Sequence, residues 1–235
     1  DVGGTFTDVV TLSGDSAALK FDKVPTTPSH PEEGVLNGFA AGGAPMADIA
    51  TFIHGTTLGL NALLTRRGAR TGIVTTKGFR DVYLLGRTDR IPMYDFKYRK
   101  PASLVERQHI VEVDERLDFE GRVLTPFDEE SAIAAARTIR DLGLDAVAVS
   151  FLHSYVNPAH EVRMAEILKA EAPDVVVTIS SDLSRQLREY ERTSTAVLDA
   201  YIKPIVRSYL DKLEGVIAER GFAGQFLMTR SGGGA

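Results

Sequence analysis

The first eight residues combine residue types that bind phosphate groups in proteins. Gly3 and Gly4 separate short β-like runs, and such glycines let the backbone turn closely around an anion with successive N–H groups facing it. Thr5 and Thr7 add hydroxyl donors, and the carboxylate of Asp1 can hold a hydrated Mg²⁺ ion through its water ligands. The pattern predicts a phosphate site, although a glycine hairpin with solvated threonines explains the same residues and short glycine patterns are weakly specific.

A second polar group, His54-Gly55-Thr56-Thr57, stands where a predicted strand meets a predicted helix that carries Asn61. Strand-to-helix junctions hold many ligand-binding groups in α/β proteins. Thr56 and Thr57 can donate hydroxyl groups to a substrate or to a terminal phosphate, but a threonine that caps a helix needs no ligand to explain it. His54 has a similarly simple explanation as a hydrogen-bonded imidazole in the core.

A third group contains metal-binding residue types, namely His153, His160 and Glu161. The spacing of the two histidines does not match two ligands on one helix face. Asn157-Pro158 is typical of a helix start, so capping explains this stretch better than a metal ion does. We therefore expect no metal site there.

The elements that position these groups follow the order βββ-α-β-α-β-α in the first part of the chain. Alternating apolar runs and helical spacing place these elements at 1–2, 6–12, 18–24, 31–42, 52–53, 58–68, 73–75 and 78–85. The first three form an antiparallel meander, and Ser29 and Glu32 form a capping-box pair with Pro31 in the first turn of the helix. The stretch 87–105 shows no periodicity and is predicted to be irregular.

The second part of the chain continues as an α/β layer and ends in a long helix. Its predicted elements lie at 110–117, 126–142, 146–152, 159–170, 175–179, 191–220 and 226–228. A hairpin turn is expected at Glu120-Gly121, and Thr125 is the predicted N-cap of a helix that begins at Pro126. The nearly continuous apolar run in 146–152 is typical of a strand covered on both faces, and Pro204 is expected to bend the long helix.

These elements give four expected segments of the sequence. They are a phosphate-binding subdomain at 1–86, an irregular flap at 87–107, an inserted α/β subdomain at 108–180, and a long helix with the start of a connection at 181–235. The sequence begins at Asp1, inside a motif, and stops at Ala235 just after a glycine run. We therefore expect it to be a fragment of a longer chain.

The composition excludes several classes of protein. The 235 residues are 43% hydrophobic and 25% charged, as in ordinary globular domains. The net charge is −5 and the basic residues are scattered, which disfavours nucleic acid as a partner. The sequence has no cysteine, hence no disulfides or thiolate metal sites, and no apolar stretch of about 18 residues that would span a membrane. The cytoplasm is the expected compartment.

Further motifs carry a resemblance to one family along nearly the whole chain. They are Gly55-Thr56-Thr57-Leu58-Gly59-Leu60-Asn61, Gly68-Ala69-Arg70-Thr71, Val74 to Asp81, Glu112 to Arg116, Leu152 to Tyr155, Asn157 to Glu161, and Arg188 to Thr195. In this order they resemble the hydantoinase A and 5-oxoprolinase family, and residues 1–8 resemble the first phosphate motif of the actin, sugar-kinase and heat-shock-chaperone ATPases. The Ser231 to Gly234 stretch departs from the family pattern, which often has Asn at the second place.

The resemblance implies a fold, a reaction and a set of site residues. The implied fold is α/β, with a ribonuclease-H-like first lobe of the actin-like ATPase type, an additional α/β block, and no second lobe to close the nucleotide site. The implied reaction uses ATP and Mg²⁺ to phosphorylate the carbonyl of a cyclic amide for ring opening. Asp1, Thr5 and Asp8 are the expected catalytic residues. Asp1 orients Mg²⁺ through water, and Gly3, Gly4, Thr5 and Thr7 hold phosphates.

The resemblance also implies a substrate site and a partner. Thr56, Thr57, Asn61, Glu189 and Arg192 are the expected substrate residues, although a solvated helix start also explains the charged run that contains the last two. A second, B-type subunit is the expected partner, and the chain alone is expected to be inactive. The alternatives are an acetone-carboxylase-type subunit, a nucleotide-binding assembly subunit whose chemistry occurs in a partner, and a small-molecule kinase.

Overall fold

The computed structural model describes residues 1–14, 18–27, 30–87 and 94–229, which form two compact units. The first unit combines Asp1–Arg67 with Ile205–Ala235, and the second is the continuous stretch Gly68–Pro204. These units group the residues differently from the four segments expected from the sequence, and that finer division remains a prediction. The first unit is discontinuous because the end of the chain returns to pack on its beginning.

The first unit opens with the antiparallel hairpin of β1 (Phe6–Leu12) and β2 (Leu19–Pro25), as predicted. Helix α1 (Pro31–Gly42) covers one face of it, and its glycines allow a close approach, since a Cβ on Gly38 would lie 2.4 Å from a methyl carbon of Val9. Strand alternation leaves large apolar side chains exposed on the hairpin, namely Phe6, Val10, Leu12, Leu19 and Phe21.

Helix α1 begins at Pro31, and its N-cap residue is His30, whose side chain makes no capping hydrogen bond. The Ser29 half of the predicted capping box lies outside the described residues. The helix ends at Gly42, and the next residue, Gly43, forms the C-cap with a left-handed φ of 78° and an N–H that donates to the Phe39 carbonyl at 3.2 Å.

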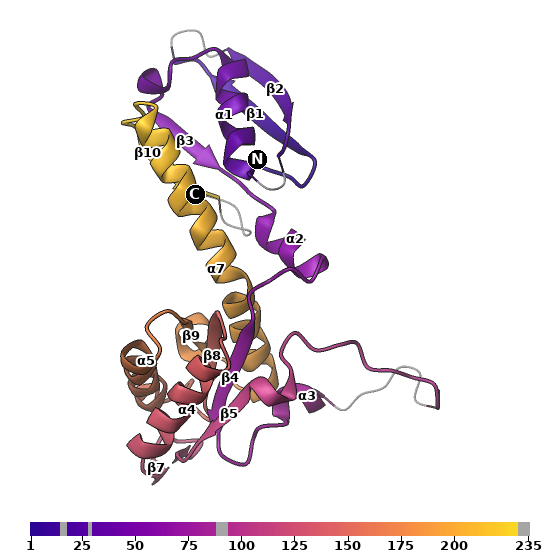
Figure 1. The fold of residues 1–235 in the computed structure, drawn as a ribbon, viewed down its shortest axis with the longest axis vertical. Coiled ribbons are helices and arrows are strands. Elements are labelled where there is room, and N and C mark those ends of the chain that lie inside the picture. Colours follow the sequence, from indigo (N-terminus) through magenta and orange to yellow (C-terminus); the bar gives the residue numbers. More distant parts are fainter. Residues whose placement is uncertain (15–17, 28–29, 88–93, 230–235) are drawn as a thin grey trace. The chain divides into compact units, whose positions relative to one another are not determined.

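A parallel pair completes the first unit. Strand β3 (Thr51–His54) pairs with β10 (Gln225–Met228), and the two lie side by side in Figure 1. In chain order, the 3₁₀ turn η1 (Met46–Asp48) precedes β3 and helix α2 (Leu58–Leu64) follows it. The second half of α7 (Glu189–Glu219) closes the core, whose buried members are Val2, Val35, Tyr209, Leu213 and Ile217.

The predicted strand at 1–2 takes a different form. Val2 makes isolated bridges, antiparallel to Thr7 and parallel to Thr56, instead of a third strand of a meander. The prediction of a simple antiparallel meander is therefore wrong at this point, because the parallel contact with Thr56 is not local in sequence.

The second unit is built on a parallel sheet with the order β5-β4-β8-β9. The strands are β4 (Thr71–Thr76), β5 (Ile110–Val113), β8 (Ala146–Ser150) and β9 (Val176–Ile179). Helices α4 (Glu129–Asp141) and α5 (Ala159–Glu171) pack on one face, and the first half of α7 packs on the other. Every residue of β8 is buried, which confirms the strand predicted from its apolar run.

Two predicted elements in this unit have wrong bounds, and two short elements were missed. The run 110–117 is divided between β5 and the short β6 (Arg116–Leu117), which forms a hairpin with β7 (Val123–Thr125). The helix predicted from Gly78 begins later, as α3 (Val82–Leu85), because Gly78 has a φ of 85° that does not fit a right-handed helix. The smaller elements α6 (Ser180–Leu183) and η2 (Arg107–His109) were not predicted.

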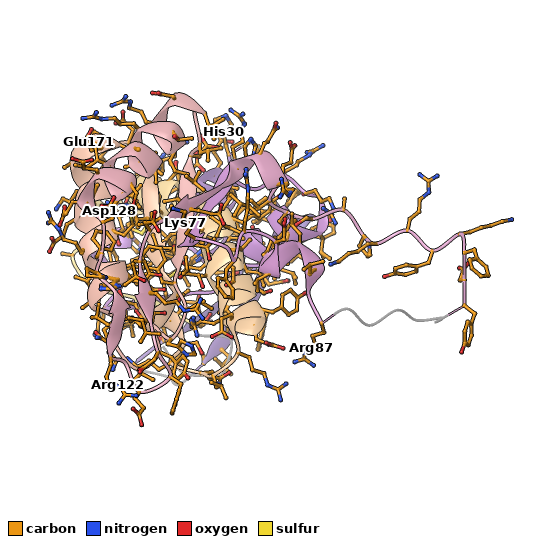
Figure 2. The ribbon with its side chains drawn as sticks, turned by 90° about the horizontal axis from the view of Figure 1, so that it is seen from below. His30, Lys77, Arg87, Arg122, Asp128 and Glu171 are labelled. Carbon is orange, nitrogen blue, oxygen red and sulfur yellow. The ribbon has the colours of Figure 1, made fainter. Side chains whose placement is uncertain are left out.

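The start of α4 also differs from the prediction. Thr125 belongs to β7, so it does not cap the helix, and the helix begins at Glu129 rather than Pro126. The N-cap is Asp128, labelled in Figure 2, whose carboxylate accepts a hydrogen bond from Ser131 N at 2.7 Å. This contact satisfies one of the backbone donors that a helix start leaves free.

Replacing Asp128 tests the importance of this cap. We expect Asp128→Ala to lower the free energy of unfolding by about 1 kcal/mol, because the Ser131 N–H loses its acceptor. Asp128→Asn retains a good capping residue and should change stability by less than about 0.5 kcal/mol. Urea unfolding followed by circular dichroism distinguishes the two, and equal losses in both variants would show that the carboxylate charge matters more than the cap.

Candidate functional site

One edge of the first unit brings together the ends of three parallel segments. Val2 donates to the Gly55 carbonyl at 2.8 Å and accepts from Thr57 N at 3.3 Å, so the start of the chain runs beside the end of β3. Thr229, just after β10, donates its N–H to the His54 carbonyl at 2.9 Å. Loops that leave the carboxyl ends of parallel strands are common ligand sites, and the polar groups predicted from the sequence lie in these loops.

The glycine loop has the features of an anion-binding turn. Gly3 N donates to the Phe6 carbonyl at 3.0 Å, and a Cβ on Gly3 would lie 3.0 Å from that oxygen, so a larger residue would strain the turn. Gly4 and Thr5 are exposed, and within the described residues their N–H groups donate to no protein acceptor. Two free, exposed amides beside a hydroxyl can bind phosphate oxygens.

The carboxylate of Asp1 lies close to Gly55 and Thr229. A Cβ on Gly55 would lie 3.4 Å from an Asp1 carboxylate oxygen and 3.1 Å from the Thr229 hydroxyl, so a side chain at this position would crowd both groups. Among the described residues no group of three or more acidic or histidine side chains is placed to hold a metal ion. An exposed single carboxylate fits Mg²⁺, which retains water ligands and takes others from phosphate.

Thr56, Thr57 and Asn61 lie at the same edge. The Thr56 hydroxyl accepts from Leu58 N at 3.1 Å, and Asn61 Nδ2 donates to the Thr57 hydroxyl at 3.3 Å. A Cβ on Gly4 would lie 3.3 Å from Asn61 Nδ2, so the amide of Asn61 stands beside the glycine loop. The structure therefore brings the two polar groups predicted from the sequence into one place.

Thr7 and Asp8 have protein partners that account for their positions. Thr7 is buried, and its hydroxyl lies 2.9 Å from the Thr26 hydroxyl on the side of the hairpin that faces α1. Asp8, on the opposite face, forms an ion pair with Lys23 across the hairpin at 3.0 Å. The phosphate contact predicted for Thr7 and the catalytic role predicted for Asp8 remain predictions, because the contacts seen for both side chains are with the hairpin.

Arg192 lies in the second unit and is 2% exposed. Its guanidinium donates to the Phe151 carbonyl at 2.6 Å and to the Ser180 hydroxyl at 3.0 Å, and that hydroxyl in turn donates to Glu161 at 2.7 Å. Burial lowers the pKa of Arg192, and the charges of Glu161 and Glu189 oppose this shift. Glu161 and Arg192, which belong to two of the family motifs, are thus held together in one buried polar network. A contact of Arg192 with substrate remains a prediction.

His54 is a buried core residue of the first unit. Its Nε2 lies 2.9 Å from the hydroxyl oxygen of Tyr209, and its ring packs against Phe52 and Phe226. Burial disfavours the charged imidazole and lowers the pKa of His54 from 6.5 to about 4, and burial raises the pKa of Tyr209. Both side chains are neutral near pH 7, which agrees with the simple reading of His54 from the sequence.

The depressed pKa of His54 predicts acid sensitivity. The unfolded chain binds a proton near pH 6.5 and the folded chain near pH 4, so the stabilisation is complete above pH 6.5 and lost as pH falls toward 4. The loss should be on the order of 3 kcal/mol between pH 7 and 4. The free energy of unfolding, measured with denaturant at several pH values in this range, should fall less steeply with decreasing pH in His54→Phe than in the parent. His30→Gln, at an exposed histidine of the same unit, should keep the parental dependence on pH.

Comparison with known proteins identifies the family. A family model described as the hydantoinase/oxoprolinase N-terminal region matches residues 1–172, and one described as hydantoinase/oxoprolinase matches residues 192–235. The chain belongs to the hydantoinase/oxoprolinase family. The resemblance found in the sequence motifs is thereby confirmed.

Individual members of the hydantoinase/oxoprolinase family are similar over the whole chain. The acetophenone carboxylase gamma subunit of Aromatoleum aromaticum is 39% identical, with 100% of this chain and 35% of that protein covered. The caprolactamase subunit alpha of Pseudomonas jessenii is 34% identical, again with 100% of this chain and 35% of that protein covered. This chain thus spans about a third of the length of these relatives.

Solved structures confirm the predicted fold class. A crystal structure of the ATP-dependent caprolactamase from Pseudomonas jessenii matches with a TM-score of 0.84 and 31% identity, covering 97% of this chain and 34% of that one. A nucleotide-free acetone carboxylase structure matches with a TM-score of 0.85 and 27% identity, covering 97% and 35%. The chain therefore has the α/β fold of the actin-like ATPase type. Among its described residues, no helix is both long and apolar enough to cross a membrane.

Proposed function

We propose that this chain supplies the first phosphate-binding part of an ATP-dependent enzyme that phosphorylates the carbonyl oxygen of a cyclic amide. The observation that carries this proposal is the common edge of Val2, β3 and β10, where free amides, hydroxyl groups and one carboxylate lie together. ATP-dependent enzymes among the relatives support ATP as the phosphoryl donor. Mg²⁺ is the metal that the donor set fits.

The proposed reaction begins with transfer of the terminal phosphoryl group of ATP to the carbonyl oxygen. The bond to the bridging oxygen of ADP breaks as the new P–O bond forms, and the amide carbon becomes electrophilic enough for water to add. The ring C–N bond then breaks as the nitrogen takes a proton, and a second water releases inorganic phosphate from the acyl phosphate that remains. In such transfers the protein mainly positions the reactants and stabilises charge. Gly4 and Thr5 donate N–H groups to phosphate oxygens, and the Thr5 hydroxyl adds a further donor.

Asp1 is the proposed ligand of the metal's water shell. Mg²⁺ at this position would neutralise charge that develops on the phosphate oxygens. The Asp1 side chain is exposed, so such a hydrated ion could approach its carboxylate from solvent. Asp8 and Thr7 support the loop through the hairpin partners Lys23 and Thr26.

Thr56, Thr57 and Asn61 are the proposed wall on the substrate side of the loop. The Thr56 hydroxyl is already engaged by the start of α2, so its orientation is fixed before a ligand arrives. Asn61 reaches both Thr57 and the neighbourhood of Gly4, which suits a residue between phosphate and substrate. A second, B-type subunit is the proposed partner, because relatives are named as subunits of carboxylases and of a caprolactamase.

A carboxylase-type reaction is the second candidate, favoured by the 39% identity to an acetophenone carboxylase subunit. Both reactions share phosphorylation of a carbonyl oxygen and differ in what attacks next. Phosphate release by the full-length protein, with and without its partner, decides between them. Stimulation by hydantoins or lactams supports the amidohydrolase reaction, and stimulation by a ketone with bicarbonate supports the carboxylase reaction. ATP turnover that no carbonyl substrate stimulates would support neither reaction.

The phosphate loop is tested in the full-length protein. Asp1→Asn and Thr5→Ala should each lower ATP turnover by at least about 100-fold, the scale of losing one preorganised group at a charged transition state. Asp48→Asn, at an exposed carboxylate of the same unit, is the matched control and should retain the parental rate. Parental turnover in both loop variants at saturating Mg²⁺ would remove this loop from the reaction.

The substrate wall is tested by separating nucleotide binding from coupling. Asn61→Ala should reduce the stimulation of ATP turnover by the carbonyl substrate by about tenfold while the nucleotide dissociation constant changes little. Thr65→Ala, at the end of the same helix, serves as the control, since its hydroxyl bonds only to the Asn61 carbonyl among described residues. A weakened nucleotide affinity with intact stimulation would instead assign Asn61 to the phosphates.

A further inference from the structure

The β1-β2 hairpin has one face covered by α1 (Figure 1) and an opposite face that is bare within the described residues. Gly38 of α1 lies against Val9, and side chains alternate along a strand, so the residues on either side of Val9 point away from the helix. Residues directly opposite each other in paired strands share a face. The outer face of the hairpin therefore contains five large apolar side chains, namely Phe6, Val10, Leu12, Leu19 and Phe21.

The outer face of the hairpin does not have the composition of a face that meets water. An antiparallel sheet with one solvated face has polar side chains there. Here the exposed fraction rises from 47% for Phe6 to 70% for Phe21, and Phe21 lies directly opposite Val10. Single apolar side chains are common on protein surfaces, whereas a contiguous group is typical of a surface that another element covers. We therefore expect an occupant on this face.

The charged side chains of the outer face already have partners. Asp8 and Lys23 lie opposite each other across the hairpin and form an ion pair at 3.0 Å. The Lys23 ammonium also lies 5.3 Å from the centre of the Phe6 ring. Both charges are matched within the hairpin, so the occupant needs no charge to satisfy them. An apolar surface of this kind is characteristic of permanent contacts rather than of transient ones.

The dimensions of the outer face suit a single helix. A strand of seven residues, the length of both β1 and β2, is about 23 Å long. Two paired strands about 4.8 Å apart present a surface about as wide as one helix. A helix of about 15 residues has the length of this surface, since each residue adds about 1.5 Å. Helix α1, with 12 residues, already covers the other face in this way.

The relatives have enough further chain to supply such a helix. This chain spans about a third of the length of its relatives, so most of a relative's chain lies outside the match. The model of the family's N-terminal region matches residues 1–172, which places the match in the early part of the protein. A segment of the same chain is held near the hairpin by covalent connection, so it covers this face at a high effective concentration.

We propose that an amphipathic helix from the part of the full-length chain that follows residue 235 packs on the outer face of the hairpin. Its apolar stripe covers Val10 and Phe21, and the hairpin then lies between this helix and α1. The same hairpin carries the glycine loop at its start, so the helix completes the support of that loop. The proposal concerns packing alone, and it does not rest on the proposed reaction.

Site-specific photo-crosslinking in the full-length protein identifies the occupant. The crosslinking amino acid p-benzoylphenylalanine, placed at position 21, keeps an aromatic side chain on the outer face. Mass spectrometry should find it joined to a peptide beyond residue 235 of the same chain, and a mixture of isotopically labelled and unlabelled chains shows whether the link is within one molecule. Links to a second copy or to a partner subunit, or no link at all, would overturn the proposal. The same probe at Phe96, which is 100% exposed in the second unit, gives the background.

A charged substitution tests the energetic consequence in the full-length chain without its partner subunit. Phe21→Glu places an unpaired carboxylate beneath the proposed helix, so the melting temperature should fall by at least about 4 °C. Phe96→Glu makes the same exchange at a fully exposed phenylalanine and should leave the melting temperature unchanged. An unchanged melting temperature in Phe21→Glu would show that the outer face remains in water. If Phe21→Glu does not fold, the crosslinking result decides, because that probe retains an aromatic ring.

Discussion

Burial of the apolar stripe of α7 is the constraint on which both units depend. The first half of the helix presents small residues, Ala196, Val197 and Ala200, which let it lie close on the parallel sheet of the second unit. The second half presents Leu213 and other larger side chains that fill the core around Val2. A long helix is stable in a globular protein when its apolar face is covered, so each core lacks a wall until α7 has formed.

Much of the fold could be predicted because local signals were strong. Proline at the first position and glycine after the end mark α1, and a short apolar run marks β8. The predictions failed where the local structure depends on contacts between residues far apart in the sequence. Glu115 interrupts the expected strand at 110–117 because it turns inward to accept hydrogen bonds from Thr76 and His160. Pairing of β7 with β6 likewise holds Thr125 in a strand, which leaves Asp128 to cap α4.

The candidate site was predictable in its parts but not in its assembly. The glycine loop and the Thr56-Thr57 junction carry recognisable residue types, whereas their meeting depends on parallel pairing of Val2 with Thr56. Thr229 was missed, although a hydroxyl directly after the predicted strand at 226–228 was an available signal. The inward position of Thr7 follows from alternation along β1, which places it opposite to Phe6 and Asp8. The partners of Arg192 come from separate segments that no local pattern joins.

The discontinuity of the first unit has a consequence for biosynthesis. The residues of the second unit leave the ribosome as one continuous stretch, so this unit can fold while the rest of the chain is still being made. The first unit begins the chain but needs Ile205 and the residues that follow to close its core. Until then Val2 and Val35 lack the partners that bury them in the folded unit. Translation and folding therefore run in opposite orders, and we expect the nascent phosphate loop to depend on chaperone protection until β10 has been synthesised.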